Sequence, residues 1–169
     1  KSKRSKTIDK VIDAIFQIQG GYALVMMTQK SLIGVRDPYG IRPLMIGKLG
    51  NSYVLASETC ALDIIGAKFI REVENGEIVL IEKDQIKSVK PFPPKKIRPC
   101  VFEYIYFSRP DSILNNKSAY EYRKNLGIEL AKENILEADM VVPVPDSGNA
   151  AALGFAQHLG MKFELGLIR

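Results

Sequence analysis

The run VPDSGNA at residues 144–150 has the residue types of an anion-binding loop. It follows an apolar stretch and precedes a helix of small residues, so its backbone N–H groups lie at a helix start, where negative charge is stabilised. Gly148 lets the backbone approach a ligand closely, and the Ser147 hydroxyl can bind phosphate or Mg²⁺. Asp146 and Ser147 can instead simply cap the helix. The loop therefore predicts either a phosphate site or a helix cap.

The run RDPYGIRPL at residues 36–44 has the composition of a turn between two strands. The Asp-Pro pair and the glycine fix the bend, and Arg36 can form an ion pair with Asp37 inside it. Arg42 could instead meet an anionic ligand, but a single arginine near a turn is weak evidence for such a site. A structural role is predicted for most of this turn.

The run YIYFSRPDS at residues 104–112 combines aromatic residues with a turn. The aromatic residues alternate as they do along one face of a strand, which places them in a core rather than on a stacking platform. In the turn, Arg109 and Asp111 either position a substrate at a domain interface or pair with each other.

Two cysteines and one histidine complete the reactive side chains. Cys60 and Cys100 lie in no CxxC pair and in no Cys/His cluster, so neither a disulfide framework nor a metal site within the chain is expected. Reduced thiols are typical of a cytoplasmic protein. Cys60 is predicted to be a small buried residue, and His158 a surface or structural one. Cys100 follows a basic stretch, and its thiolate could bind a metal whose other ligands lie elsewhere.

Composition excludes several classes of protein. The 169 residues are 46% hydrophobic and 25% charged, which is typical of a globular chain and not of a disordered or collagen-like one. No apolar run approaches the roughly 20 residues that cross a bilayer. The net charge of +5 is concentrated in residues 1–10 and 83–98, and neither segment forms a known nucleic-acid-binding module. We expect neither a membrane nor a nucleic acid as partner.

Residues 1–90 have the pattern of a helix followed by an antiparallel sheet. Residues 6–18 place apolar side chains at helical spacing, with Thr7 as a cap. A second, short helix is predicted over residues 59–65, with Ser57 as its N-cap. Short runs punctuated by glycine predict strands, with a closing hairpin at the end. These strands are predicted at residues 22–28, 31–35, 44–48, 53–57, 77–82 and 85–89.

The run KPFPPKKIRP at residues 90–99 contains four prolines and four cations and predicts an extended connector. We place a domain boundary there, with a first domain at residues 1–90, a linker at 91–99 and a second domain at 100–169. Alternation in the second domain predicts a strand at residues 101–107. A helix is predicted over 119–134, with Tyr122, Leu126 and Leu130 on its apolar side. The run at 139–145 predicts a buried parallel strand, residues 150–159 a helix and residues 162–168 a further strand, which together form a βαβ unit.

Five runs in the same order resemble the glutamine phosphoribosylpyrophosphate amidotransferases, also called amidophosphoribosyltransferases. FEYIYFSRPDS followed by a VPDSG loop is specific to that family, whereas asparagine synthetases carry a turn similar to RDPYGIRPL. The five runs are GGYALVMM (20–27), GVRDPYGIRPL (34–44), VLASETCALD (54–63), CVFEYIYFSRPDS (100–112) and VVPVPDSGNAAALGFA (141–156).

The resemblance implies a fold and a reaction. The fold class is α+β followed by α/β: the C-terminal half of an αββα N-terminal-nucleophile glutaminase, then the start of a type I phosphoribosyltransferase with a parallel sheet. Glutamine is hydrolysed in the first domain, and the ammonia displaces pyrophosphate from phosphoribosylpyrophosphate in the second, giving phosphoribosylamine. This is the committed step of purine synthesis, carried out in the cytoplasm by what we expect to be a homo-oligomer.

The resemblance also assigns roles to four residues. Ser147 matches a position that binds Mg²⁺ or pyrophosphate, with Asp146 and Gly148 shaping the loop. Cys100 matches a cysteine that ligates a [4Fe–4S] cluster in one branch of the family, with its three partner cysteines expected beyond residue 169.

Several parts of the family pattern are not found in the sequence. The chain begins at Lys1, without the N-terminal cysteine nucleophile, and the acidic ribose-phosphate loop is absent. We therefore expect no catalytic residue here, and a segment of a longer enzyme that is inactive alone. Two alternatives remain: an asparagine-synthetase-like amidotransferase, and a non-catalytic interaction or regulatory module that kept the fold and lost the chemistry.

Overall fold

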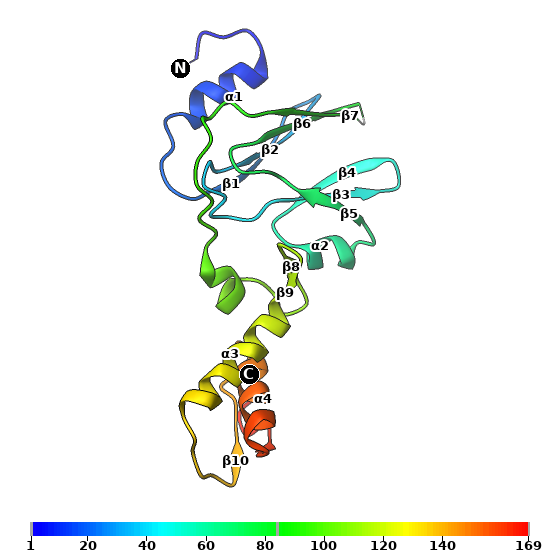
Figure 1. Cartoon of the computed structure of the whole chain (residues 1–169). Coiled ribbons are helices and arrows are strands. Elements are labelled where there is room, and N and C mark those ends of the chain that lie inside the picture. The colour runs from blue at the N-terminus through cyan, green and yellow to red at the C-terminus, as the bar shows by residue number, and fades with distance from the viewer. Residues whose placement is uncertain (1, 84, 169) are drawn as a thin grey trace. The chain divides into compact units, whose positions relative to one another are not determined.

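The computed structural model describes residues 2–83 and 85–168. The chain divides into two compact units, Lys1–Cys100 and Val101–Arg169. Figure 1 labels their helices and strands. The first unit contains α1 (Thr7–Ile15), β1 (Ala23–Met27), β2 (Leu32–Arg36), β3 (Met45–Leu49), β4 (Ser52–Ala56), α2 (Thr59–Ile64), β5 (Lys68–Glu72), β6 (Ile78–Glu82) and β7 (Gln85–Val89).

Two antiparallel sheets form the body of the first unit, in the strand orders β1-β2-β6-β7 and β4-β3-β5. The mixed helix-and-strand character predicted from the sequence is confirmed, and β5 is an additional strand. The predicted closing hairpin is β6–β7, and its residue Asp84 lies outside the described residues. All six predicted strands match an observed strand to within one residue at each end.

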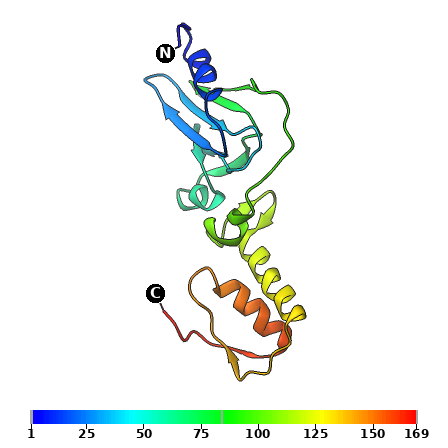
Figure 2. The ribbon, with the colours of Figure 1, turned by 90° about the vertical axis from the view of Figure 1, so that its left-hand side faces the viewer.

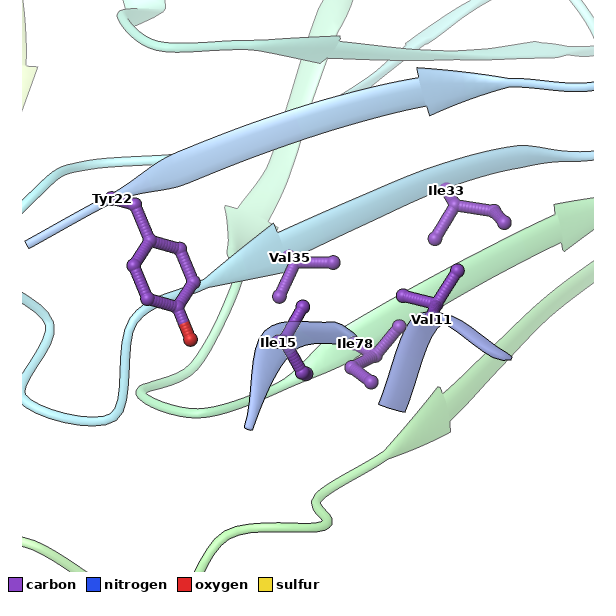
Figure 3. Close-up of a cluster of buried hydrophobic side chains, with 6 residues drawn as sticks. All are labelled: Val11, Ile15, Tyr22, Ile33, Val35 and Ile78. Atoms are coloured by element: carbon purple, nitrogen blue, oxygen red, sulfur yellow. The ribbon is translucent and has the colours of Figure 1, made fainter. Parts of the chain in front are cut away.

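The layers of the first unit follow helix, sheet, sheet, helix (Figure 1). Helix α1 packs its apolar side on the larger sheet. There Ile15, which is 2% exposed, belongs to a cluster of buried side chains from the helix and the sheet, shown in Figure 3. A second cluster fills the space between the two sheets. Because β6 is covered on both faces, its run IVLI is apolar throughout and does not alternate. The first cluster consists of Val11, Ile15, Tyr22, Ile33, Val35 and Ile78, and the second of Leu44, Ile46, Val73, Val79 and Ile81.

Both predicted N-caps of this unit are wrong. Helix α1 starts at Thr7 itself, with Lys6 in the cap position, and α2 starts after Glu58 rather than after Ser57. Neither cap residue accepts a side-chain hydrogen bond from its helix. Tertiary contacts of a helix can outweigh the roughly 1 kcal/mol that a cap contributes.

The turn at residues 36–44 is built around two buried charges. Arg36 forms its ion pair with Glu72 of β5, at 3.1 Å, rather than with Asp37 as predicted. Its guanidinium also donates to the Val73 and Arg42 carbonyl oxygens. The Asp37 carboxylate is fully buried and accepts backbone N–H groups from within the turn and from Tyr22, the residue before β1. The structural role predicted for the turn therefore rests on these two side chains.

Glu77 is a second buried carboxylate in the first unit. It receives a two-point ion pair from Arg71, at 2.7 and 2.8 Å, and hydrogen bonds from the Ser88 hydroxyl and the Glu74 N–H, both at 2.6 Å. Burial opposes ionisation of this carboxyl, but these hydrogen bonds outweigh burial and hold the pKa of Glu77 below its usual value.

We expect Glu77→Gln to make the stability of the chain less sensitive to acid. The pKa of Glu77 is 4.5 when unperturbed and lower in the folded chain, so its ionised form stabilises the fold fully above about pH 4.5. That contribution is lost as the pH falls through the depressed pKa. In urea titrations from about pH 7 down to pH 3, the parent should lose stability more steeply than the variant.

At neutral pH the same variant should be less stable by about 2 kcal/mol. This is below the roughly 3–5 kcal/mol for breaking a fully buried pair, because the Arg71 side chain is 37% exposed. Glu129→Gln, in an exposed pair with Lys132, is the control and should change neither quantity. Parallel pH curves for Glu77→Gln and the parent would contradict the expectation.

The Pro-rich segment at residues 91–99 is extended, with no regular secondary structure. It follows the surface of the first unit, where the N–H groups of Arg98 and Cys100 donate to the carbonyl oxygens of Tyr39 and Ile41. Phe92 contacts Phe16, with ring centroids 4.8 Å apart. The assignment of this segment as a linker between two functional domains stays a prediction.

The second unit is built on two helices in direct contact. Its elements are the π-helix η1 (Glu103–Phe107), β8 (Ile113–Leu114), β9 (Lys117–Ser118), α3 (Ala119–Glu133), β10 (Met140–Val141), α4 (Asn149–Leu159) and β11 (Lys162–Phe163). Figure 2 shows α3 and α4 side by side. Strands β10 and β11 pair in parallel on either side of α4 in the chain, as the predicted βαβ unit requires. Helix α4 ends at Gly160, whose φ of 67° is left-handed.

Three predictions for this unit are wrong. Residues 101–107 are helical, with a π turn, and do not form a strand. The run at 139–145 forms only the two-residue strand β10, and Val144 is 71% exposed, because only β11 pairs with β10 among the described residues. Helix α3 buries not the predicted side but the neighbouring one, shifted by one residue along the sequence, and Leu130 is 51% exposed. The buried residues of α3 are Ala119, Arg123, Gly127 and Ala131.

Small residues explain the buried side of α3. A Cβ atom on Gly127 would lie 2.6 Å from the Ala151 carbonyl carbon, and one on Gly154 would lie 2.9 Å from that of Lys124. Such distances leave no room for a side chain, so the two helix backbones touch. Leucine residues on this side would hold the helices apart. Within the described residues, no helix is long and apolar enough to cross a membrane.

Candidate functional site

A cavity of about 420 Å³ in the second unit brings together part of the predicted anion loop and the turn after η1. Asp146 and Ser147 form one wall, and both are exposed to solvent. The other wall is the segment at 106–110. The cavity is lined by Tyr106, Phe107, Ser108, Arg109, Pro110, Arg123, Pro145, Asp146 and Ser147.

The loop leads directly into the 11-residue helix α4. Gly148 is the N-cap residue, and no side chain makes a cap hydrogen bond there. The interpretation of Asp146 and Ser147 as helix caps is therefore wrong, and both residues line the cavity. A Cβ atom on Gly148 would lie 2.5 Å from the Val144 carbonyl oxygen, so the loop closes tightly on itself at this glycine. The Pro145–Asp146 peptide bond is cis.

Cations line the opposite wall. Arg109 donates two hydrogen bonds to Asp111, at 2.9 and 2.6 Å, so of the two predicted alternatives the local pair is the one observed. The hydrogen bonds from Arg109 hold the pKa of the exposed Asp111 carboxyl below its usual value. Arg109 lies on the cavity wall, and Asp111 does not.

Arg123 is a residue of this cavity that sequence reasoning missed. It is 3% exposed, and its guanidinium donates to the Tyr104 and Ser108 carbonyl oxygens, both at 2.7 Å. The signal that could have identified it is a four-residue repeat on α3, in which Arg123 stands among small residues: Ala119, Gly127 and Ala131. A charged residue within a row of small residues on one helix side indicates a buried charge at a close packing surface.

The other predicted residues lie away from the cavity. Cys60 is 4% exposed in the first unit, and His158 is exposed on α4, as predicted. Cys100 is half-buried, with a free thiol. Over residues 2–83 and 85–168, no group of three or more His, Cys, Asp or Glu side chains could hold a metal ion.

The arrangement has the chemistry of a site for an oxyanion with a bound cation. Carboxylate and hydroxyl oxygens are ligands that Mg²⁺ accepts, and Asp146 and Ser147 present both in one wall. The positive end of α4 and the guanidinium groups of Arg109 and Arg123 favour negative charge. Among the described residues that line the cavity there is no carboxylate pair, nucleophile–base pair or other acid–base set.

Comparison with known proteins gives three kinds of similarity. The sequence profile of a glutamine amidotransferase domain matches residues 4–63. Amidophosphoribosyltransferase of Rhizobium etli is 52% identical over 174 residues, which cover 100% of this chain and 35% of that protein. Amidophosphoribosyltransferase of Synechocystis is 50% identical, over 96% of this chain and 33% of that protein. The chain thus spans about a third of the length of these relatives.

A solved structure gives the same result. Glutamine phosphoribosylpyrophosphate amidotransferase of Bacillus subtilis, complexed with ADP and GMP, superposes with a TM-score of 0.95 at 44% identity, over 99% of this chain and 37% of that one. These matches confirm the resemblance to amidophosphoribosyltransferases that the five sequence runs predicted.

Proposed function

We propose that this chain acts as part of an amidophosphoribosyltransferase, which transfers the amide nitrogen of glutamine to phosphoribosylpyrophosphate. The products are phosphoribosylamine, glutamate and pyrophosphate, in the first committed step of purine synthesis. The proposal is supported by identity of about half across the whole chain. The cytoplasmic location and homo-oligomeric state expected from the sequence belong to the same proposal.

The first unit would belong to the glutaminase half of the enzyme and the second to the phosphoribosyltransferase half. The glutamine amidotransferase profile falls within the first unit, and the parallel pair β10–β11 with α4 lies in the second. The second unit would contribute the binding pocket for the second substrate, phosphoribosylpyrophosphate.

The single observation that carries the site assignment is the cavity shared by Asp146, Ser147 and two arginines. We assign it to the pyrophosphate group of phosphoribosylpyrophosphate and its Mg²⁺. The Ser147 hydroxyl and the Asp146 carboxylate would hold the cation, which supplies neutralisation of the pyrophosphate charge. Arg109 would face the phosphate oxygens, and Gly148 would keep the loop tight enough for backbone N–H groups to face them too.

We also propose that Cys100 is one ligand of a [4Fe–4S] cluster. Such a cluster takes four cysteine ligands, and the chain contains two, of which Cys60 is buried in the first unit. The remaining ligands would have to come from other residues. Iron analysis of the full-length protein, with and without Cys100→Ser, tests this assignment, and absence of iron from the unmutated full-length protein would refute it.

We expect Ser147→Ala to weaken binding of Mg²⁺-pyrophosphate about tenfold. Loss of one hydrogen bond to a charged group costs about 1.5–3 kcal/mol. Ser147 is exposed, so its replacement by alanine should affect the ligand and leave the fold unchanged. Isothermal titration with pyrophosphate in excess Mg²⁺ measures the change. In a protein with amidotransferase activity, use of phosphoribosylpyrophosphate should fall while glutamine hydrolysis is unchanged.

The control for this prediction is Ser52→Ala, an exposed serine of the first unit. It should bind Mg²⁺-pyrophosphate like the parent. Equal affinity of Ser147→Ala and Ser52→Ala would argue against a role for Ser147, and equal loss of both half-reactions would argue against a site-specific one.

A further inference from the structure

The turn that forms one wall of the cavity begins with an unusual helix. Residues Glu103–Phe107 form a π turn, closed by the Ser108 N–H on the Glu103 carbonyl oxygen at 3.2 Å. The chain then turns to an extended conformation at Ser108, with ψ of 146°. Carbonyl groups at the end of a helix lack partners within the helix and must find them elsewhere. Single π turns occur frequently at functional sites.

Arg123 supplies the missing partners from another helix. Its Nε donates to the Tyr104 carbonyl oxygen and its Nη2 to that of Ser108, each at 2.7 Å. These two carbonyls lie four residues apart, one inside η1 and one just after it. Nε–H and Nη2–H point from the same edge of the guanidinium plane, so one side chain fixes both ends of the turn. A lysine has a single ammonium and lacks this fixed two-point geometry.

Arg123 is also connected to the opposite wall of the cavity, through the packing of α3 on α4. It lies on α3, one turn before Gly127, where the α3 backbone touches α4. Helix α4 follows directly on the loop that contains Asp146 and Ser147. The side chain therefore joins the segment at 106–110 to the helix pair that supports the anion loop.

We propose that Arg123 is a positioning residue for the pyrophosphate pocket, which sets the wall at 106–110 relative to Asp146 and Ser147. It does so through its two hydrogen bonds to the η1 turn, and its charge alone is not sufficient. The part of this inference that concerns ligand affinity rests on the proposed function. The structural part, that the two hydrogen bonds of Arg123 hold the η1 turn, does not. Arg123→Lys is the decisive variant, because it retains the positive charge and most of the aliphatic side chain but loses the pair of N–H donors on one edge of the guanidinium.

Two measurements on the full chain test this inference. The first is amide hydrogen exchange at Ser108, whose N–H closes the π turn. We expect at least tenfold faster exchange in Arg123→Lys, with unchanged exchange in the middle of α3. The second is titration with Mg²⁺-pyrophosphate, for which we expect at least tenfold weaker binding at an unfolding midpoint close to that of the parent. Lys132→Met, at an exposed position on the same helix, should leave both unchanged.

The outcomes separate this inference from the proposed function. If the parent chain does not bind Mg²⁺-pyrophosphate, the site assignment fails and the exchange data alone decide the role of Arg123. If the parent binds and Arg123→Lys retains both parental affinity and parental exchange at Ser108, the inference is overturned. Arg123→Gln provides the second variant: its amide can donate to one carbonyl, so its exchange at Ser108 should also exceed that of the parent. Parental exchange in both variants overturns the inference whatever the ligand does.

Discussion

Asp37→Asn should destabilise the first unit by about 4 kcal/mol or more, although the two side chains have the same shape. Asp37 is fully buried and uses both oxygens as acceptors. Oδ1 accepts the N–H groups of Tyr39 and Ile41, at 3.0 and 3.1 Å. Oδ2 accepts those of Tyr22 and Arg42, at 3.3 and 3.0 Å. An asparagine must place its NH₂ group at one of the two oxygen positions, against two N–H donors.

The magnitude follows from the number of groups left unsatisfied. Each buried donor without an acceptor costs about 1–3 kcal/mol, and the charge that strengthened the other two hydrogen bonds is also lost. For a unit of about 100 residues, about 4 kcal/mol corresponds to a fall of at least 15 °C in the unfolding midpoint. It is also a large fraction of the 5–15 kcal/mol that stabilises an ordinary domain. Asp37→Ala should cost at least as much, because all four donors then lose their acceptor.

Thermal unfolding followed by far-ultraviolet circular dichroism measures this effect, and urea titration gives the free energy. Asp63→Asn is the matched control, because Asp63 is an exposed carboxylate in the same unit. It should change the stability by less than about 0.5 kcal/mol. A midpoint for Asp37→Asn within a few degrees of the parent would show that the turn tolerates the loss of its acceptors.

The example of Asp37 shows how far sequence reasoning reaches in this chain. The composition of RDPYGIRPL predicted a structural turn, because proline, glycine and aspartate each restrict the backbone locally. The partners of the two charges could not be predicted in this way. Arg36 pairs with Glu72, which is 36 residues away, and Asp37 binds the N–H of Tyr22, which is 15 residues away. Such contacts depend on how sheets pack, which no local pattern contains.

Strands whose signal is local were predicted well. In the hairpin β6–β7 a short polar turn follows the apolar run of β6 and precedes the mostly polar β7, and the observed strands lie within one residue of the prediction. The run at 101–107 failed because aromatic and β-branched residues are typical of strands, whereas here they form a π turn. That turn is completed by Arg123, from a helix later in the chain. The local preference of these residues for a strand is outweighed by the tertiary hydrogen bonds from Arg123.

The site was predicted in part for the same reason. The loop at 146–148 combines a strand end, a glycine and a helix start, all of which are visible in the sequence, and the structure places Asp146 and Ser147 on a cavity wall. The opposite wall depends on α3, whose leucines suggested the wrong buried side. Glycine and alanine are buried instead of leucine because the backbones of α3 and α4 are in contact. This contact cannot be predicted from the sequence of α3 alone.

The close contact between α3 and α4 makes Gly154→Ala the second change with a large expected effect. In an isolated helix this substitution is stabilising by about 1 kcal/mol. Here the new methyl group would lie 2.9 Å from the Lys124 carbonyl carbon and closer still to its oxygen, and both atoms belong to the backbone of α3. Backbone cannot move aside as a side chain does, so the helices must separate. We expect a loss of about 3 kcal/mol, at the upper end of the cost of overpacking.

Gly127→Ala provides a symmetrical test. Its methyl group would meet the carbonyl of Ala151, three residues before Gly154. In the same way, a methyl group on Gly154 would meet the carbonyl of Lys124, three residues before Gly127. The control is Gln157→Ala, an exposed position on α4, which should be neutral or slightly stabilising. Gly154→Ala with parental or greater stability would show that the helices are not held in backbone contact.

The double variant distinguishes a shared contact from two separate ones. Once the first methyl group has pushed α3 and α4 apart, the second meets a gap that already exists, so its additional cost should be well below its cost alone. The separation should also reach the cavity, because α3 carries Arg123 and α4 follows the loop of Asp146 and Ser147. Affinity for Mg²⁺-pyrophosphate should therefore fall in Gly154→Ala at temperatures where the chain is still folded. If stability falls and affinity does not, the two walls of the cavity are not held together through the helix pair.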